Sequence, residues 1–577
     1  MIDEIIDQGA AAIRWDSRIS VAAGLLSIVF FTRLITSLRS RIALWRAGSE
    51  KIPPILPYSL PGLGNLLAFA FDTKELLSVI IQKYGPNIPV RIRVLNRKLH
   101  FISGHESVLA IFKGSRDLTT APASILVLEN AFGSPASARH VFERDNTGVS
   151  SQPLEGSNDL EPHNRVFAIT HRSLHGHLQG IGLKELAARF LYFLEAELSA
   201  LDIGPDEWTA IPDFYDLLKK SIFKASTTAL CGPTLFELNP DLTDDFWEFD
   251  THIAKLFKNL PRWMIPRAFA VRDKMKASIT KWHLYAGERF DRDDEALQKL
   301  EWEELFGTRL MRTRQTDFAG VDGLNEDAIA ASDLGMIWGT NANIVPMIGW
   351  SMIDTLIRPE LLAQVREEIS SIAGSSAKGS DIGEHMPKLL SNPLLQSIYS
   401  EELRVRNGVI IQRVPVVDNF KVGNWKFPKG DMIVTSTWHE QRDRSVWNEG
   451  PNMEHSVEEF WAERFLVYPN DPNSGPGKPG RDTKSKGRVG GIDEANRPIF
   501  TTDSVTGSYI PYGGGTKICP GRFYAKQEAI GAMAMFLTMF DIELEKNDIP
   551  QPNMEYFPFG VVPPLGIFPA RMRRRKV

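Results

Sequence analysis

The chain has 577 residues, of which 43% are hydrophobic and 24% are charged, a balance that excludes a disordered or fibrous protein and predicts a large buried core. Its formal net charge of −5 gives no general reason to expect nucleic acid as a partner. The two cysteines, Cys231 and Cys519, are too few for a disulfide framework or a four-cysteine zinc site, and they favour a reducing compartment.

The first predicted element is an apolar stretch at residues 19–36, in which Arg33 is the only charged residue. The stretch is long enough to cross a bilayer as a helix, and an arginine near one end can reach the headgroups. Basic residues accumulate after it, so the positive-inside tendency places the rest of the chain in the cytosol. We expect a short N-terminal segment (1–18) and a single-pass anchor (19–36), with a cleaved signal peptide or a buried helix as the alternatives.

Residues 37–65 are rich in basic side chains and in proline, including Pro53, Pro54, Pro57 and Pro61. Proline fixes φ and favours an extended, semi-rigid chain. This segment is therefore predicted to be a hinge between the anchor and the catalytic body.

Residues 66–570 are predicted to form one catalytic domain that is mainly α with small β-sheets, an α+β pattern. Helical spacing of apolar residues is clear at 183–201 and 359–374, whereas 88–104 alternates like a hairpin and 409–434 predicts several strands. Residues 470–498 are rich in Gly, Pro and charge and are expected to form a long exposed loop. The last residues, 571–577, are expected to be a solvated basic tail.

Cys519 lies between a glycine-rich turn and a segment with helical periodicity, in which Pro520 suits the first helical position. Unpaired N–H groups and the positive end of the helix dipole stabilise an anion there, so we expect the pKa of this thiol to be lowered. Such a thiolate is a candidate nucleophile or metal ligand. A phosphate loop is a weaker alternative, because the P-loop order of glycines and lysine is missing. Cys231 is interpreted as a core residue.

The segment YGGGTKICPG (512–521) resembles F-x-x-G-x-R-x-C-x-G, the haem-thiolate signature of the cytochrome P-450 superfamily. The resemblance implies that Cys519 is the axial ligand of the iron of haem b, and that Tyr512, Gly515, Lys517 and Gly521 bind the cofactor. Tyr512 stands where Phe is usual, and Lys517 replaces the Arg or His that commonly meets a haem propionate. Lysine keeps the charge but loses the bidentate geometry of arginine.

Three further elements of the superfamily follow in the expected order. EELR (401–404) is similar to the E-x-x-R of the K helix, and WAERF (461–465) is similar to P-E-R-F. The resemblance implies that Glu401, Arg404 and Arg464 form a buried structural lock beneath the haem loop. Arg413 matches the strand arginine that often reaches a propionate.

The stretch IWGTNANIVPMIGW (337–350) corresponds to the I helix, which in the family usually reads A/G-G-x-D/E-T. Gly339 and Thr340 fall at the two small positions, but Ala342 and Asn343 occupy those of the acid and the threonine. This pattern, with Pro346 three residues on, resembles the branch of the sterol 7α-hydroxylases and prostacyclin synthase. That branch contains both hydroxylases and an isomerase. Gly339, Thr340 and Asn343 are the candidate catalytic residues.

The C helix of the family usually supplies W-x-x-x-R, and this pattern is not intact in THRSLHGHL (170–178). Arg172 is the candidate for a contact with a propionate. His171, His175 and His177 are interpreted as ordinary surface or cap residues.

A thiolate ligand favours O–O cleavage, so the resemblance implies a haem-thiolate monooxygenase. We expect a microsomal, fungal-type enzyme of the endoplasmic reticulum membrane that acts on a lipophilic terpenoid, sterol, polyketide or alkaloid in secondary metabolism. Its expected electron donor is NADPH-cytochrome P-450 reductase, which would dock on a basic surface formed by Lys517, Arg522 and Lys526. The first alternative is an isomerase or dehydratase that rearranges a peroxide without NADPH, and the second is a non-enzymatic haem-binding protein or sensor.

Overall fold

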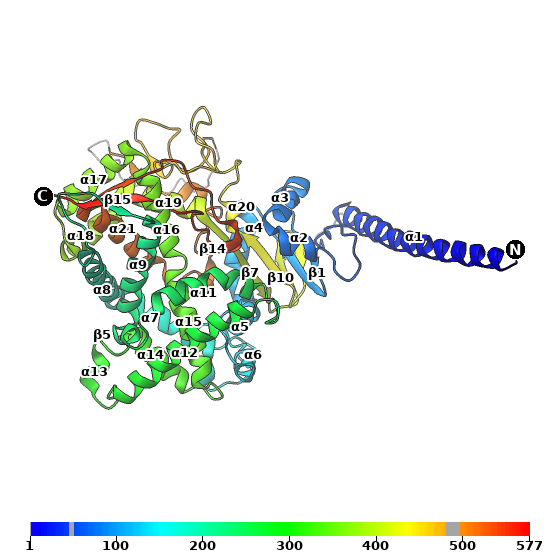
Figure 1. Cartoon of the computed structure of the whole chain (residues 1–577), viewed down its shortest axis with the longest axis horizontal. Helices are drawn as coiled ribbons and strands as arrows, with labels where there is room; N and C mark the ends of the chain where they lie inside the picture. The colour runs from blue at the N-terminus through cyan, green and yellow to red at the C-terminus, as the bar shows by residue number, and fades with distance from the viewer. Residues whose placement is uncertain (1, 46–50, 481–496, 577) are drawn as a thin grey trace. The chain divides into compact units, whose positions relative to one another are not determined.

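The computed structural model describes residues 2–45, 51–480 and 497–576, with side chains from residue 18 onward. It is mainly helical with small β-sheets, as the sequence predicts (Figure 1). The chain divides into two compact units. Unit 1 comprises Met1–Thr119 and Ile411–Ser436, and unit 2 comprises Thr120–Ile410 and Thr437–Val577. Each unit is described by itself.

Unit 1 contains a small sheet in which β1 (Val90–Val94) and β2 (Arg97–Phe101) form the predicted antiparallel hairpin. Strand β10 (Met432–Ser436) pairs with β2 in parallel, and β8 (Phe420–Val422) forms a second hairpin with β9 (Trp425–Phe427). Short β3 (Leu118–Thr119) pairs with the last residues of β7 (Asn407–Pro415). The helices of this unit are α1 (Ile2–Trp45), α2 (Leu66–Phe71), α3 (Thr73–Tyr84) and α4 (His105–Lys113).

Helix α1 continues beyond the apolar stretch to Trp45, so the first residues of the expected hinge are helical. The buried Thr36 hydroxyl donates to the carbonyl of Tyr58 at 3.1 Å, and the Arg33 guanidinium donates to the carbonyl of Pro57. The end of α1 therefore packs on its own unit. Within the described residues, Arg18–Trp45 is the one helical segment long and apolar enough to cross a membrane, and its surface is almost entirely exposed.

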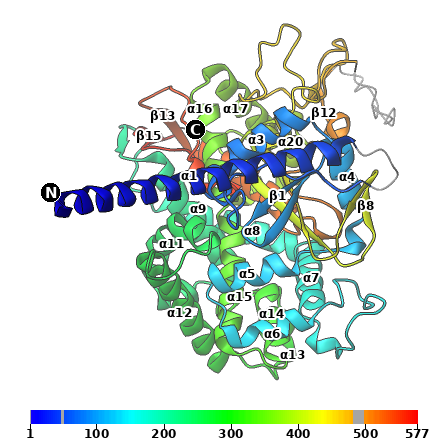
Figure 2. The ribbon, with the colours of Figure 1, turned by 90° about the vertical axis from the view of Figure 1, so that its right-hand side faces the viewer.

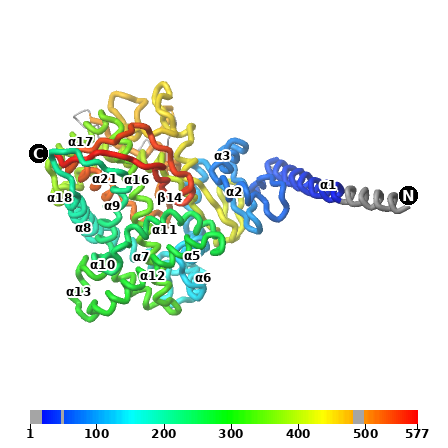
Figure 3. The backbone as a smooth tube through the Cα atoms, in the orientation of Figure 1, coloured from blue at the N-terminus to red at the C-terminus, as the bar shows by residue number. Residues whose placement is uncertain are grey.

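Unit 2 is built from helices around one large apolar core. Helix α8 packs against α9, α18 and α21 in this core, α18 also packs against α21, and the traces of these helices are seen in Figure 3. The longer helices are α5 (Ala121–Asn130), α7 (Val166–His177), α8 (Gly180–Ser199), α9 (Phe214–Cys231), α11 (Leu242–Phe257), α12 (Pro266–Arg289), α14 (Arg309–Ala319), α15 (Glu326–Asn341), α16 (Ile344–Leu356), α17 (Pro359–Ala373), α18 (Gly379–Ser391), α19 (Pro393–Arg406) and α21 (Arg522–Met539). The short ones are α6 (Arg139–Arg144), α10 (Thr234–Leu238), α13 (Glu295–Lys299) and α20 (Thr437–Glu440).

The strands of unit 2 are short. Strand β15 (Ala570–Arg574) pairs with β13 (Phe540–Leu544) and β4 (Thr209–Ile211), and β13 and β15 lie side by side in Figure 2. The prediction of a solvated tail is therefore wrong for residues 571–574, because the sheet uses their backbone and carboxylates on β13 pair with their arginines. The remaining pairs are β5 (Trp302–Glu303) with β6 (Gly307–Thr308), β11 (Leu466–Val467) with β12 (Ile499–Phe500), and β14 (Phe559–Val561) with the start of β7. Of the expected loop at 470–498, residues 481–496 lie outside the described part.

A buried histidine joins three helices of unit 2. His283 on α12 contacts Glu326 through Nδ1 at 2.6 Å and Asp333 through Nε2 at 3.3 Å, and both acids lie on α15. Arg314 on α14 donates to Asp333 at 2.8 and 3.0 Å. Burial alone would lower the pKa of His283, but the two carboxylates raise it above its usual 6.5.

We predict that His283→Gln lowers stability mainly at acid to neutral pH. A raised histidine pKa means that the stabilisation is complete below pH 6.5 and is lost as the pH rises through the raised pKa. Loss of one partner from this buried cluster should cost about 3 kcal/mol at pH 6, and less at higher pH. Thermal unfolding between pH 6 and 9 measures this loss of stability. The control is His163→Gln, because the ring of His163 is half-exposed and pairs with Asp322. An unchanged pH profile in His283→Gln would refute the assignment.

Candidate functional site

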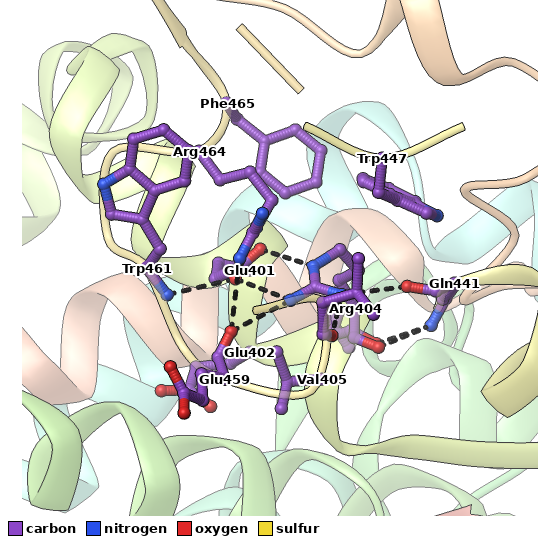
Figure 4. Close-up of polar contacts among 12 residues, drawn as sticks. Glu401, Glu402, Arg404, Val405, Gln441, Trp447, Glu459, Trp461, Arg464 and Phe465 are labelled. Carbon is purple, nitrogen blue, oxygen red and sulfur yellow. Dashed lines mark hydrogen bonds and ion pairs between the residues drawn. The ribbon is translucent and has the colours of Figure 1, made fainter. Parts of the chain in front are cut away.

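A buried carboxylate with two guanidinium groups forms the base of the site (Figure 4). Glu401 on α19 accepts from Arg404 one turn later, at 2.7 and 2.8 Å, and from Arg464 at 2.9 Å. All three side chains are completely buried. Burial alone would raise the pKa of Glu401, but the two cations outweigh it and the pKa lies below its ordinary value. The sequence prediction of a Glu–Arg–Arg cluster is confirmed.

The remaining N–H groups of the two arginines bind backbone carbonyls. Arg404 donates to the carbonyls of Gln441, Val457 and Glu459 at 2.6–3.0 Å, and its guanidinium lies 5.3 Å from the centre of the Trp447 ring. Arg464 bonds the carbonyls of Asn448, Ser456 and Glu459. The cluster therefore fixes the irregular segment 441–464 onto α19, since buried carbonyls require donors.

Two contacts connect α19 and this segment with the cysteine loop. Gln441 donates from Nε2 to the carbonyl of Leu403 at 2.9 Å, and its Oε1 accepts from the N–H of Ile510 at 3.2 Å. Tyr512 forms a hydroxyl–hydroxyl contact with Tyr399 of α19. The tyrosine that stands at the usual phenylalanine position thus has a partner for its hydroxyl group.

The cysteine loop turns on glycines. Gly513 and Gly515 have φ of 71° and 68°, a region in which other residues are strained. The N–H of Cys519 donates to the carbonyl of Tyr512 at 3.0 Å and closes the loop. The sequence predicts Pro520 as the first residue of the helix, but α21 begins two residues later, at Arg522. The Cys519 sulfur accepts from the N–H groups of Gly521 and Arg522.

The thiol of Cys519 is exposed, whereas Cys231 is buried in the core as expected. Enough protein surrounds Cys519 that desolvation raises its pKa, although the two N–H groups and Arg522 act in the opposite direction. The expectation of a lowered pKa is therefore wrong for the chain alone, because desolvation exceeds the effect of the helix start. A bound cation would reverse this balance.

The helix expected at 337–350 is interrupted where the motif departs from the family pattern. Helix α15 ends at Asn341 and α16 begins at Ile344, so Asn343 lies in the break. Its Oδ1 accepts from the N–H of Val561 on β14 at 2.9 Å. Because a backbone N–H can only donate, this contact assigns the amide orientation and leaves Nδ2 as a donor.

The other two candidate catalytic residues lie just before the break. Gly339 is exposed although α15 is otherwise mostly buried, and a Cβ atom built on it would meet open space. The Thr340 hydroxyl donates to the carbonyls of Met336 and Ile337 at 2.7 and 3.1 Å. Open space therefore borders α15 at Gly339, and the proton of Thr340 is engaged within its own helix.

On α7, His171 rather than Arg172 lies beside the cysteine loop. Arg172 is 72% exposed and pairs with Asp317 at 3.6 Å. His171 instead contacts the backbone of Thr516 and lies beside Lys517, and the centre of its ring lies 4.1 Å from that of the tilted His175 ring. Helical phase decides this, since one residue along a helix rotates the side chain by about 100°.

Two further basic residues that the sequence assigns to the site, Arg413 and Lys526, are more buried than their expected roles suggest. Arg413 on β7 is buried in unit 1 above the Phe112 ring, and burial lowers its pKa to about 10. Lys526 on α21 is part-buried and donates to Gln396 at 2.6 Å, and burial lowers its pKa to about 8. Lys526 is therefore a poor member of the expected docking surface, whereas Arg522 lies beside Phe523, which is 45% exposed.

Comparison with known proteins gives a consistent result. The family model described as Cytochrome P-450 matches residues 214–568. The chain is 35% identical to cytochrome P-450 monooxygenase fsoE of Humicola fuscoatra over 100% of this chain and 97% of that protein. It is also 35% identical to cytochrome P-450 monooxygenase efuG of Hormonema carpetanum, over 96% of each. Cholesterol 7-alpha-monooxygenase of Cricetulus griseus is 21% identical over 89% of this chain and 92% of its own length.

We predict that Glu401→Ala destabilises unit 2 by about 3–5 kcal/mol, because two buried guanidinium groups lose their counter-ion. Thermal or urea unfolding of the purified protein measures the loss. Glu459→Ala is the matched control, since Glu459 is exposed and contributes only its backbone carbonyl to the cluster. Equal stability of Glu401→Ala and Glu459→Ala would contradict the account.

Proposed function

This chain belongs to the cytochrome P-450 family of monooxygenases, and from this premise we propose that it oxidises a lipophilic small molecule, a terpenoid, sterol, polyketide or alkaloid, in fungal secondary metabolism. The single observation that carries the proposal is the exposed Cys519 thiol, held by a glycine loop whose backbone N–H groups point at the sulfur. The family implies a haem-thiolate cofactor. We propose haem b.

The residues present fit such a cofactor. In the described part of the chain, no three His, Cys, Asp or Glu side chains gather closely enough to hold a metal ion. Cys519 would supply one ligand of the iron, and the nitrogens of a macrocycle would supply others. The exposed thiol and the open space at Gly339 are two surfaces of the kind that a flat cofactor covers.

Cys519 would hold the iron, and Tyr512, Gly515 and Gly521 would shape the loop around it. Lys517 is proposed to meet a propionate, and Arg413 is a candidate for the same role from the family resemblance alone. His171 joins them as a candidate because it lies beside Lys517. When bound, a haem with a thiolate ligand supplies the activation of dioxygen for insertion of oxygen into a C–H bond.

The chain's own contribution to oxygen chemistry is proposed to come from Asn343 and Thr340. Asn343 cannot act as a carboxylic acid, but its Nδ2 is a hydrogen-bond donor because Oδ1 is occupied by the N–H of Val561. The Thr340 oxygen can still accept, since its proton is donated within the helix. Gly339 leaves room for the reacting groups. Asn343 would thus offer a hydrogen-bond donor and Thr340 an acceptor, and neither residue would release a proton itself.

A substrate with an apolar body agrees with the names of the relatives. One is named cholesterol 7-alpha-monooxygenase and another 25-hydroxycholesterol 7-alpha-hydroxylase, and both names specify polycyclic lipophilic alcohols. The names of the two fungal relatives contain the word monooxygenase, which favours oxygen insertion over peroxide rearrangement. Rearrangement of a peroxide without NADPH remains the second candidate, because Asn343 replaces the usual threonine.

We further propose that the enzyme is anchored to the endoplasmic reticulum by the N-terminal helix and receives electrons from NADPH-cytochrome P-450 reductase in the cytosol. The exposed apolar side chains of Arg18–Trp45 support the anchor. Arg522 and Lys517, near the cysteine, support a basic docking surface, whereas the part-buried Lys526 does not.

We predict that Cys519→Ala abolishes the absorption band that marks thiolate ligation in the reduced CO complex. The matched control is Cys231→Ala, which removes the other thiol from the core and should leave the band intact. Retention of the band in Cys519→Ala would exclude the assigned ligand.

We predict that turnover requires dioxygen, NADPH and the reductase, and that one atom of labelled dioxygen enters the product. Mass spectrometry of products formed under labelled dioxygen measures this. Comparable conversion of hydroperoxides under anaerobic conditions without NADPH would instead support the rearrangement reaction.

A further inference from the structure

We propose that Asp250 on α11 determines substrate specificity by accepting a hydrogen bond from a hydroxyl group of the substrate. The inference rests on the proposed function, because it assumes that a lipophilic substrate binds beside α15. The inference adds one polar contact, with Asp250, to the apolar contacts expected for such a substrate.

Asp250 is a buried carboxyl group held by neutral donors. The indole N–H of Trp338 donates to its Oδ1 at 2.9 Å, and the Tyr556 hydroxyl is a second hydrogen-bond partner. In the part of the chain that the structure describes, no lysine or arginine lies within ion-pair distance of it; the nearby Lys219 pairs with Asp216 at 3.2 Å. A buried carboxylate without a cation is costly unless donors surround it.

The position of Asp250 connects it with the candidate catalytic residues. Trp338 immediately precedes Gly339, at which α15 borders open space. Tyr556, its other partner, lies five residues before Val561, which binds Asn343. Asp250, through Tyr556, and Asn343, through Val561, therefore both contact the chain segment 556–561.

Aromatic rings surround this position. Trp338 packs against Phe132 at 5.8 Å and Phe257 at 5.5 Å, and Phe257 stacks on Phe559 at 4.8 Å. These residues come from the segment after α5, from α11, α15 and β14. Such a wall suits an apolar polycyclic body. Because apolar contacts orient such a body weakly, one polar contact would fix which carbon faces the oxidant.

The donor–acceptor balance leaves room for one more donor. A carboxylate has about four acceptor sites, and Trp338 and Tyr556 account for two. Burial raises the pKa of Asp250 to about 6, although both donors and Lys219 lower it, so the group is ionised at neutral pH. Because its charge is already partly compensated, a neutral hydroxyl, which is cheaper to desolvate than an ammonium group, is the better partner.

A merely structural role is the competing interpretation, in which Asp250 only fastens α11 to α15. The two roles differ in what they do to selectivity. A fastening role lowers the affinity for every ligand alike, whereas a recognition role removes the preference for alcohols over matched hydrocarbons.

The test is a spectral titration of the purified haem-loaded enzyme with cholesterol, with the hydrocarbon that lacks its hydroxyl group, and with the amine that replaces it. Matched alcohol and hydrocarbon pairs of polycyclic terpenes extend the panel. We expect wild type to bind the alcohols at least about tenfold more tightly than the hydrocarbons. Asp250→Asn and Asp250→Ala should lose this preference. Asp244→Asn, on the exposed face of α11, is the matched control and should keep it.

Three outcomes would overturn the proposal. Equal discrimination by wild type and both Asp250 variants shows that Asp250 does not read the hydroxyl. Tighter binding of the amine than of the alcohol, if this preference is lost in Asp250→Asn, refutes the choice of a neutral donor; the comparison with Asp250→Asn is needed because direct binding of the amine nitrogen to the iron does not depend on Asp250. If wild type binds no member of the panel although its CO complex has the thiolate band, the proposed lipophilic substrate class itself fails, which is a distinct result.

Discussion

The burial of Glu401 between Arg404 and Arg464 is the interaction on which the rest of the site depends. Three charged groups without solvent contact are stable only together, because each would be costly to bury alone. The arginines also bind five carbonyls of residues 441–459 between them, so one ion cluster fixes a long segment without regular structure. Through Gln441 the same constraint reaches Ile510, at the start of the cysteine loop.

In both the cysteine loop and the interrupted helix, the residue that differs from the family pattern has a hydrogen-bond partner of its own. Tyr512 has a hydroxyl where phenylalanine has none, and Tyr399 contacts it. Asn343 replaces a threonine, and the N–H of Val561 fixes its amide. Both substitutions add a contact between elements. They connect the site more strongly, and Nδ2 of Asn343 is the group that we propose for contact with a ligand.

The sequence predicts what depends on local spacing. Glu401 and Arg404 lie one helical turn apart, and the glycines before Cys519 are required by backbone conformation, so both are read directly from the chain. Quantities that depend on packing are not predicted. The pKa of Cys519 is set by desolvation, and Lys526 is part-buried by α19. Asp250 is missed altogether, because a single aspartate in an amphipathic helix carries no signal until its partners at 338 and 556 are placed.

The central claim is that this fold holds Cys519 as the thiolate ligand of an iron. X-ray absorption at the iron edge of the purified, haem-loaded chain tests it most directly, because it reports the atoms bound to the metal regardless of substrate or redox partner. The account predicts one sulfur atom in the first coordination shell of the iron, in addition to the nitrogens of the macrocycle. A first shell that contains only nitrogen and oxygen atoms would contradict it.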